Sequence, residues 1–480
     1  METILSTTDG ITFTTGQAIL ELSYLIAAIL FVIGLKLLSH PESARKGNLW
    51  AGTGMVLAMV TTLLLHKDAA GNHIPLGNAV LVLAAIAVAG ITGWIIARRI
   101  KMTAMPQLVS FFNATGGAAS ALVAFLEFPN VSGTGVIIIT LLGLTIGSIS
   151  FSGSLIAYGK LDGKVGDIRA AFMKYVNITL LLIVIVLIIF ITAGTAGTSV
   201  MQNPQLIVSI LLAVALLYGV LFVMPIGGAD MPVVISLLNS LTGIAAAMAG
   251  FIYSNQAMIL GGILVGAAGS ILTVLMCRAM NRSLMNVIIG AFGGGGTAGP
   301  GQEGAIKEVS VSDAGILMAY SQRIVIVPGY GLAVAQAQHI ASELDDLLSD
   351  KGVEVKFAIH PVAGRMPGHM NVLLAEADVP YEKLVEMDAI NPALPNTDVV
   401  VVVGANDVVN PAAEEDPSSP IYGMPIIKAH TAKNIIVMKR GMGKGYAGIE
   451  NHLFFNDKTR MLFGNAKDSL QKLVTEIKSL

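Results

Sequence analysis

Residues 325–334 read Val-Ile-Val-Pro-Gly-Tyr-Gly-Leu-Ala-Val, an apolar strand pattern that runs into a glycine turn and then a helical pattern. Gly329 permits a tight turn, and Gly331 lets the backbone approach the pyrophosphate of a dinucleotide at the start of a helix. Two glycines alone are a weak signal, but here they follow a strand and open a helix, as the dinucleotide fingerprint requires. The predicted binding turn comprises Gly329, Tyr330, Gly331, Val334 and Ala335.

The chain around this turn alternates between short apolar runs and helical stretches. Strands are predicted at 323–327, 353–359, 399–403 and 434–438, and helices at 333–348, 370–377 and 467–480. Short strands separated by helices indicate a parallel, doubly wound sheet. Residues 305–480 are therefore predicted to form an α/β Rossmann-like domain.

Residues 1–283 have a different character. The whole chain is 54% hydrophobic and 12% charged, outside the range of roughly 45–50% apolar and 25% charged that soluble domains show. A membrane-spanning helix needs about 20 mainly apolar residues. Stretches that meet this requirement are centred near Leu30, Ala58, Ala87, Leu122, Thr145, Val184, Ala215, Ala245 and Leu264. We expect a polytopic α-helical membrane domain of about nine spans.

A glycine-rich segment at 290–304 has the composition of a flexible tether. The predicted division is a transmembrane domain at 1–283, a linker at 284–304 and a soluble domain at 305–480. Basic residues beside the spans predict the orientation, because twelve would lie on the side of the soluble domain and one, Lys67, on the other. This bias places the N-terminus outside and the soluble domain in the cytoplasm.

The predicted strand at 434–438 ends in Lys439 and Arg440, which open a glycine-rich loop. An NAD site normally has an acid at the end of its second strand, but the strand ending at Ile359 has none. Two adjacent cations neutralise a 2′-phosphate, and arginine does so with two hydrogen bonds. The pattern favours NADP(H) over NAD(H), with a solvated basic turn as the alternative.

Two further stretches follow predicted strands, where ligands bind in open α/β sheets. The first contains Gly404, Ala405, Asn406 and Asp407, and the second contains His360, Val362, Ala363, Gly364 and Arg365. Asp407 is a candidate partner for a ribose hydroxyl or a carboxamide, although a lone Asp in a loop is more often a turn former. No acidic or cysteine partner stands at metal spacing, and Cys277 is the only cysteine, so we expect no metal site.

Candidate functional polar residues inside the predicted spans are Glu21, Asn113, Ser154, Asn177 and Asn239. Asp230 lies in a short turn. Polar groups in a membrane usually face the bundle interior or a water path, but for any one Asn or Ser taken alone interhelical hydrogen bonding is the more common explanation. The residues alone therefore do not establish proton conduction, and nothing in the composition indicates nucleic-acid binding.

At these residues the chain resembles the beta subunit of proton-translocating NAD(P) transhydrogenase. The most specific blocks are 227–234, 328–338, 360–375, 404–411 and 439–448. The resemblance implies NADP(H) on this chain, NAD(H) on a partner alpha subunit, and hydride transfer coupled to inward proton movement. It also implies a dimer of alpha–beta units in the lipid bilayer of the bacterial inner membrane.

The resemblance also implies roles for individual residues. Asp407 matches a carboxylate beside the nucleotide, and Tyr446 matches a residue of a lid loop that also contains Gly445 and Ala447. Asp407 and Tyr446 are the predicted catalytic residues. Lys439 and Arg440 match a 2′-phosphate clamp. The predicted proton path and its communicating face comprise Asn113, Ser154, Asn239, Asp230 and Arg282.

Two departures from the family pattern matter. Some members have a His where this chain has Asn113, and an Asn side chain, unlike a His, cannot titrate. A Ser is common in the family where this chain has Gly441. Two other functions stay open on the residues alone. One is a channel or transporter regulated by NADP(H), and the other is a membrane-anchored dehydrogenase with an organic substrate. The sequence offers no charged mid-membrane substrate site for the former and no clear acid–base pocket for the latter.

Overall fold

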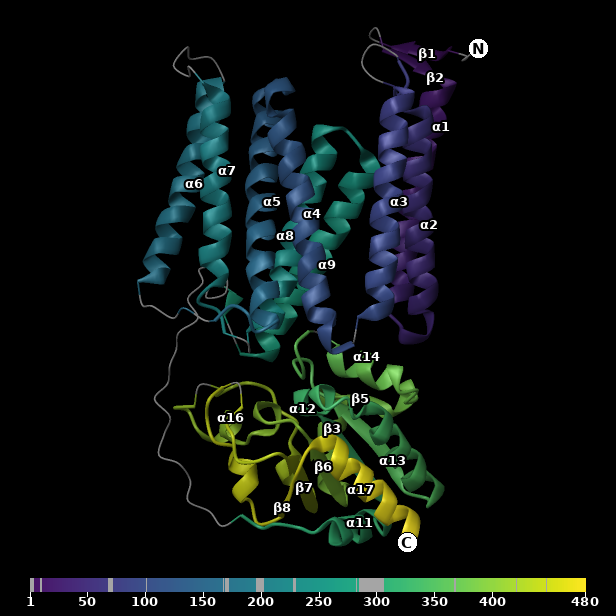
Figure 1. Cartoon of the computed structure of the whole chain (residues 1–480), viewed down its shortest axis with the longest axis vertical. Helices are drawn as coiled ribbons and strands as arrows, with labels where there is room; N and C mark the ends of the chain where they lie inside the picture. Colours follow the sequence, from purple (N-terminus) through teal and green to yellow (C-terminus); the bar gives the residue numbers. More distant parts are fainter. Residues whose placement is uncertain are drawn as a thin grey trace.

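The computed structural model describes residues 4–8, 11–67, 72–100, 102–166, 168, 172–195, 203–227, 230–281, 283–284, 306–366, 368–419, 421–445 and 447–480. It has two parts, a bundle of long helices and an α/β domain that lies against one end of the bundle (Figure 1). The N-terminal hairpin, β1 (Ile4–Thr8) and β2 (Ile11–Thr14), lies at the opposite end of the bundle.

Within the described residues, nine helices are long and apolar enough to cross a membrane. They are α1 (Thr15–Leu38), α2 (Pro41–Leu65), α3 (Leu76–Arg99), α4 (Met105–Glu127), α5 (Thr134–Leu161), α6 (Met173–Thr195), α7 (Pro204–Val223), α8 (Met231–Ile252) and α9 (Gln256–Ala279). Each contains one of the nine predicted centres, so the helical membrane part of the fold is confirmed.

Glycines let the central helices of the bundle approach closely. A Cβ at Gly117 of α4 would lie 2.7 Å from the carbonyl oxygen of Gly147 on α5. A Cβ at Gly243 of α8 would lie 2.5 Å from the amide nitrogen of Gly266 on α9. Small residues at helix contacts are typical of membrane bundles, where close backbone packing replaces the hydrophobic effect. In contrast, α3 has no buried residue.

The α/β domain contains one six-stranded parallel sheet in the order β5-β4-β3-β6-β7-β8. Its strands are β3 (Arg323–Pro328), β4 (Glu354–Ile359), β5 (Leu384–Glu386), β6 (Val399–Val403), β7 (Asn434–Lys439) and β8 (Thr459–Phe463). The doubly wound fold is confirmed, and all four predicted strands are present. Two strands of this sheet were not predicted from the sequence, namely β5, which is three residues long, and β8.

Helices and turns cover both faces of this sheet. They are α11 (Val311–Ala319), α12 (Tyr330–Val334), α13 (Gln338–Asp350), α14 (His369–Glu376), α15 (Met387–Ile390), α16 (Ala412–Glu415) and α17 (Ala466–Ser479). Alternate residues of the all-valine strand β6 face opposite sides, so Val401 joins one buried cluster and Val400 joins the other. A parallel strand that is buried on both faces is apolar throughout.

The prediction of one continuous helix at 333–348 is wrong in its first residues, where the structure has two separate helices. The short helix α12 ends at Val334, and α13 begins only at Gln338. Between them Gln336 has a φ of 50°, a left-handed conformation that interrupts the helical hydrogen bonds. The short α12 therefore turns the chain directly after the glycines, before the longer helix packs on the sheet.

Candidate functional site

The site begins where the strand order reverses, between the neighbouring strands β3 and β6. Gly329 follows β3, and a Cβ there would lie 2.4 Å from the Cα of Ala405. A Cβ at Gly331 would lie 2.7 Å from the Cα of Gly404, whose φ is +66°. The amide of Gly331 also donates a hydrogen bond to the carbonyl oxygen of Gly404, at 2.9 Å.

At the carboxyl edge of the sheet these two turns pack backbone against backbone, with no side chain between them at Gly329 and Gly331. Ligands of doubly wound sheets bind at this edge, in the crevice where the strand order reverses. Only glycine fits at positions 329 and 331, because any side chain would collide with the backbone of the adjacent turn. This cradle fits the pyrophosphate of a dinucleotide, which needs close approach to the backbone.

Asp407 connects the turn after β6 with the loop after β7. One of its carboxylate oxygens, Oδ2, accepts a hydrogen bond from the amide of Ala447 at 3.0 Å. A Cβ at Gly445 would lie 2.3 Å from the other oxygen, Oδ1. The structure thus brings Asp407, Gly445 and Ala447 together, while Tyr446, which the sequence analysis placed between them, lies outside the described residues.

The two predicted clamp residues differ in their surroundings. The Lys439 ammonium donates to the carbonyl oxygen of Gly443 and lies 4.6 Å from the ring centroid of Phe454. Burial lowers the pKa of Lys439, and the nearby Asp407 carboxylate opposes that shift. Arg440 is exposed at the start of the loop, so its guanidinium is accessible to a ligand.

His360 does not point a ring nitrogen into the crevice. Its Nε2 lies 2.8 Å from the carbonyl oxygen of Pro425, and its Nδ1 accepts from the amide of Val362 at 3.2 Å. This pair of bonds defines the neutral tautomer with the proton on Nε2. Burial lowers the pKa of His360 to about 4, so the ring fixes the course of the loop after β4.

The same loop carries Arg365, which reaches both parts of the molecule. Its guanidinium lies over the ring of Tyr330 in the glycine turn, 4.6 Å from the centroid. Its Nη1 donates to the carbonyl oxygen of Leu161, the last residue of α5, at 3.0 Å. Gly364, with a φ of +105°, leaves room for the ring of His369, whose Nδ1 accepts from the amide of Arg365.

A further wall of the site, which the sequence did not predict, is formed by the residues that follow the loop after β7. Asn451 donates to the backbone and side-chain oxygens of Asn406, at 2.9 and 3.0 Å. Asn410 donates to the carbonyl oxygen of Glu450 and accepts from the amide of His452. Asn410 belongs to the family-specific stretch 404–411, but its partners Glu450 and His452 lie in a segment without a sequence motif.

The predicted membrane residues lie on neighbouring helices. Asn113 of α4 is buried and donates to the carbonyl oxygen of Ile235 on α8, at 3.4 Å. Ser110 of α4 donates to the carbonyl oxygen of Ser154 on α5, at 2.8 Å. Asn239 follows Ile235 by about one turn of α8 and is half-buried. Helices α4, α5 and α8 therefore share one polar contact region.

The face toward the α/β domain is formed by the ends of the central helices. Buried Asp230 is the N-cap residue of α8, and Arg282 lies outside the described residues. Val362 packs against a cluster that includes Val233 and Cys277. The side-chain amide of Asn281 donates to the carbonyl oxygen of Tyr422 at 2.6 Å.

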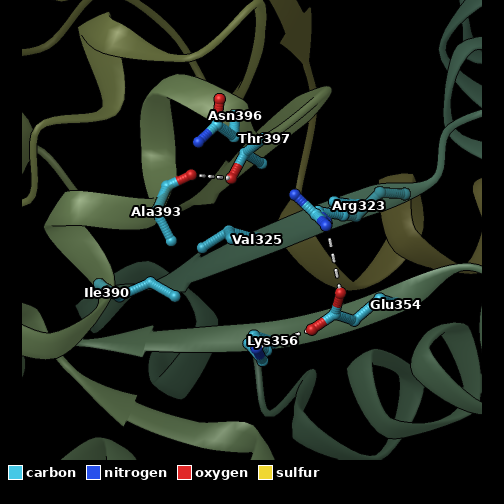
Figure 2. A pocket seen from close by; sticks show the side chains of 9 residues that line it. Arg323, Val325, Glu354, Lys356, Ile390, Ala393, Asn396 and Thr397 are labelled. Atoms are coloured by element: carbon cyan, nitrogen blue, oxygen red, sulfur yellow. Dashed lines mark hydrogen bonds and ion pairs between the residues drawn. The ribbon is translucent and has the colours of Figure 1, made fainter.

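A pocket of about 210 Å³ opens at the opposite, amino edge of the sheet (Figure 2). Glu354 accepts from Lys356 at 2.7 Å and faces Arg323 at 3.5 Å, so its charge is compensated within the pocket. The lining residues are Arg323, Ile324, Val325, Glu354, Lys356, Ile390, Ala393, Asn396 and Thr397. Among the predicted nucleotide residues that the structure describes, none lines this pocket.

Comparison with known proteins agrees with this architecture. Residues 20–476 match the family model described as NAD(P) transhydrogenase beta subunit. Two Rhodospirillum rubrum proteins named NAD(P) transhydrogenase subunit beta, one of them from a defined strain, are each 47% identical over 467 residues. The match covers 94% of this chain and 97% of each relative. With its membrane helices and doubly wound domain, the chain belongs to the NAD(P) transhydrogenase beta subunit family.

Proposed function

We propose that this chain is the NADP(H)-binding half of a proton-pumping transhydrogenase. A partner alpha subunit holds NAD(H), and hydride passes between the two nicotinamides while a proton crosses the membrane inward. The proposed assembly is a dimer of alpha–beta units in the bacterial inner membrane, with the N-terminus outside and the α/β domain in the cytoplasm. The proposed domain limits are 1–283, 284–304 and 305–480.

The observation that carries this proposal is the meeting of glycine turns and cations at one edge of the sheet. Gly329 and Gly331 provide the close approach that a pyrophosphate needs, against the turn of Gly404 and Ala405. Lys439 is the last residue of β7, the strand next to β6, and Arg440 follows it with an exposed side chain. A cationic pair selects a nucleotide with an added 2′-phosphate.

The remaining proposed site residues orient and enclose the nucleotide. Asp407 holds the lid segment through Ala447 and reports protonation beside the nucleotide, and Tyr446 completes the lid. The turn residues Tyr330, Val334 and Ala335 and the loop residues His360, Val362, Ala363, Gly364 and Arg365 shape the adjoining walls. Nicotinamide supplies the hydride chemistry when bound, and this chain supplies position and exclusion of water.

Coupling to the membrane gives the reaction a direction. One elementary charge that crosses 100 mV releases about 2.3 kcal/mol, enough to shift a product ratio about fiftyfold. Proton binding must then change the affinity for NADP(H), and the effect must be reciprocal. We propose that the polar region around Asn113, Ser154 and Asn239, with Asp230 and Arg282 at the cytoplasmic face, forms the path.

The path needs a titratable group, because Asn113 cannot exchange a proton at neutral pH. We propose that a histidine in a span of the partner subunit supplies that group, and the alternatives are a water chain and Glu21 of α1. Replacing every intramembrane histidine of the partner with glutamine is expected to abolish pumping in reconstituted complex. Normal pumping by that variant would refute the assignment.

The clamp is tested by replacing Lys439 with Ala in the full chain. The loss of a charged hydrogen-bonding partner of the phosphate costs about 1.5–3 kcal/mol, so NADPH affinity is expected to fall about 10- to 100-fold. NADH lacks the 2′-phosphate, so its affinity is expected to change little. Binding titrations with both nucleotides measure the difference, and equal losses would refute the clamp.

A further inference from the structure

We propose that Phe454 is a positioning residue for nucleotide selection, because its ring holds the Lys439 ammonium in place for a 2′-phosphate. The inference rests on the proposed NADP(H) function and adds a determinant from another segment of the chain. The Lys439 Nζ atom lies 4.6 Å from the centroid of the Phe454 ring. A cation at this distance from an aromatic face is attracted by the ring quadrupole.

The ring is fixed where it lies. Phe454 is 3% exposed and belongs to the buried cluster that contains Val437 and Met461 of the adjacent strands β7 and β8. It lies in the short 3₁₀ helix η7 (His452–Phe455), whose N-cap Asn451 accepts from the amide of Leu453 at 2.9 Å. Phe454 therefore presents a rigid surface to a flexible side chain.

Asn451 also aligns this ring with the rest of the site. Its side-chain amide donates to both oxygens of Asn406, in the turn after β6 that leads to Asp407. These contacts fix the position of the Phe454 ring relative to the Asp407 loop and the Lys439 side chain. A lysine has a long stem with several rotatable bonds, so contacts of this kind determine where its charge lies.

Three groups interact with the Lys439 ammonium. They are the carbonyl oxygen of Gly443, the ring of Phe454 and the nearby carboxylate of Asp407. Burial acts against the charged form of Lys439, and the ring face compensates without using an N–H donor. The ammonium has three N–H groups, so donors are left for a phosphate after the bond to Gly443.

The test is the ratio of NADPH affinity to NADH affinity, measured by titration of the purified full chain. Phe454→Leu keeps an apolar side chain but removes the aromatic face, and the ratio is expected to fall about fivefold, equivalent to about 1 kcal/mol. Phe454→Trp and Phe454→Tyr keep an aromatic face and are expected to retain most of the ratio. Phe455→Leu, in the same turn and partly buried on the same cluster, is the matched control and should leave it unchanged.

A double-mutant comparison separates this inference from the proposed function. In a Lys439→Ala background, Phe454→Leu is expected to change the ratio no further, because the ring then has no cation to hold. If Lys439→Ala lowers the ratio but Phe454→Leu does not, the clamp stands and the role of Phe454 is refuted. Equal loss of both nucleotides in Phe454→Leu also refutes it, since a packing defect does not discriminate between them. If Lys439→Ala leaves the ratio intact, the clamp itself is wrong, and the inference falls with it.

Discussion

At the scale of single residues, two hydrogen bonds and burial decide what His360 does. Its Nδ1 accepts from Val362 and its Nε2 lies against Pro425, so the neutral ring ties together two loops beside the crevice. The sequence analysis grouped this histidine with the nucleotide ligands because it stands at the end of a strand. Its two backbone contacts indicate that it also supports the loop that carries Arg365.

The pH dependence of stability follows from this neutral state. The pKa of His360 is lowered from 6.5 to about 4, so the unfolded chain binds a proton before the folded one does. Its stabilising contribution is present above pH 6.5 and is lost as the pH falls toward about 4, by up to about 3 kcal/mol. Urea unfolding of the α/β domain in the full chain, followed across this window, measures the loss. His360→Gln does not titrate and is expected to show a smaller slope, whereas an identical slope would contradict the assignment.

At the scale of elements, the two turns after β3 and β6 depend on each other. A Cβ at Gly329 would meet the backbone of Ala405 at 2.4 Å, and backbone cannot move aside as a flexible side chain does. Gly329→Ala is expected to cost about 1–3 kcal/mol of stability and to weaken NADPH and NADH alike, more than tenfold. Gly441→Ala is the control, because a Cβ at that position would have no atom within 4 Å. Melting curves and nucleotide titrations compare the two variants. Intact nucleotide binding in Gly329→Ala would contradict the role of the close backbone contact between the two turns.

The same elements explain what the sequence could and could not predict. Apolar spans, strands and the Gly-x-Gly turn are local patterns, so the nine described membrane helices and four of the six strands of the α/β sheet were predictable. The wall formed by Asn451 and Phe454 was not, because the segment after Gly448 has no motif and reaches the site only through the pairing of β7 with β8. The break at Gln336 was missed because its left-handed φ has no strong sequence signal.

At the scale of the whole molecule, the α/β domain contacts the bundle through the walls of the proposed site. Arg365 donates to the end of α5, and Val362 packs against the cluster that contains Cys277. In this arrangement α12, which follows the carboxyl end of β3, lies on the side of the α/β domain nearest the membrane helices (Figure 1). We propose that hydride exchange with a partner requires release of these contacts, through the predicted linker.

A cross-link tests this arrangement, because the chain has a single native cysteine. Val362→Cys is expected to react with Cys277 through a short thiol cross-linker, and the linked protein should lose most of the hydride exchange that the unlinked variant shows with the partner. Tyr320→Cys, at an exposed position beyond α11, is the matched control and should not link. Failure of position 362 to link, or full exchange in the linked protein, would contradict the proposed docking.

The central claim is that occupancy of the NADP(H) site is coupled to charge movement through the helical bundle. The test uses vesicles that contain the reconstituted alpha–beta complex under an imposed pH gradient. The quantity measured is the final concentration ratio [NADPH][NAD⁺]/[NADP⁺][NADH]. The account predicts that the ratio shifts about tenfold for each pH unit, if one proton crosses per hydride. A final ratio and a rate that do not respond to the gradient would contradict it.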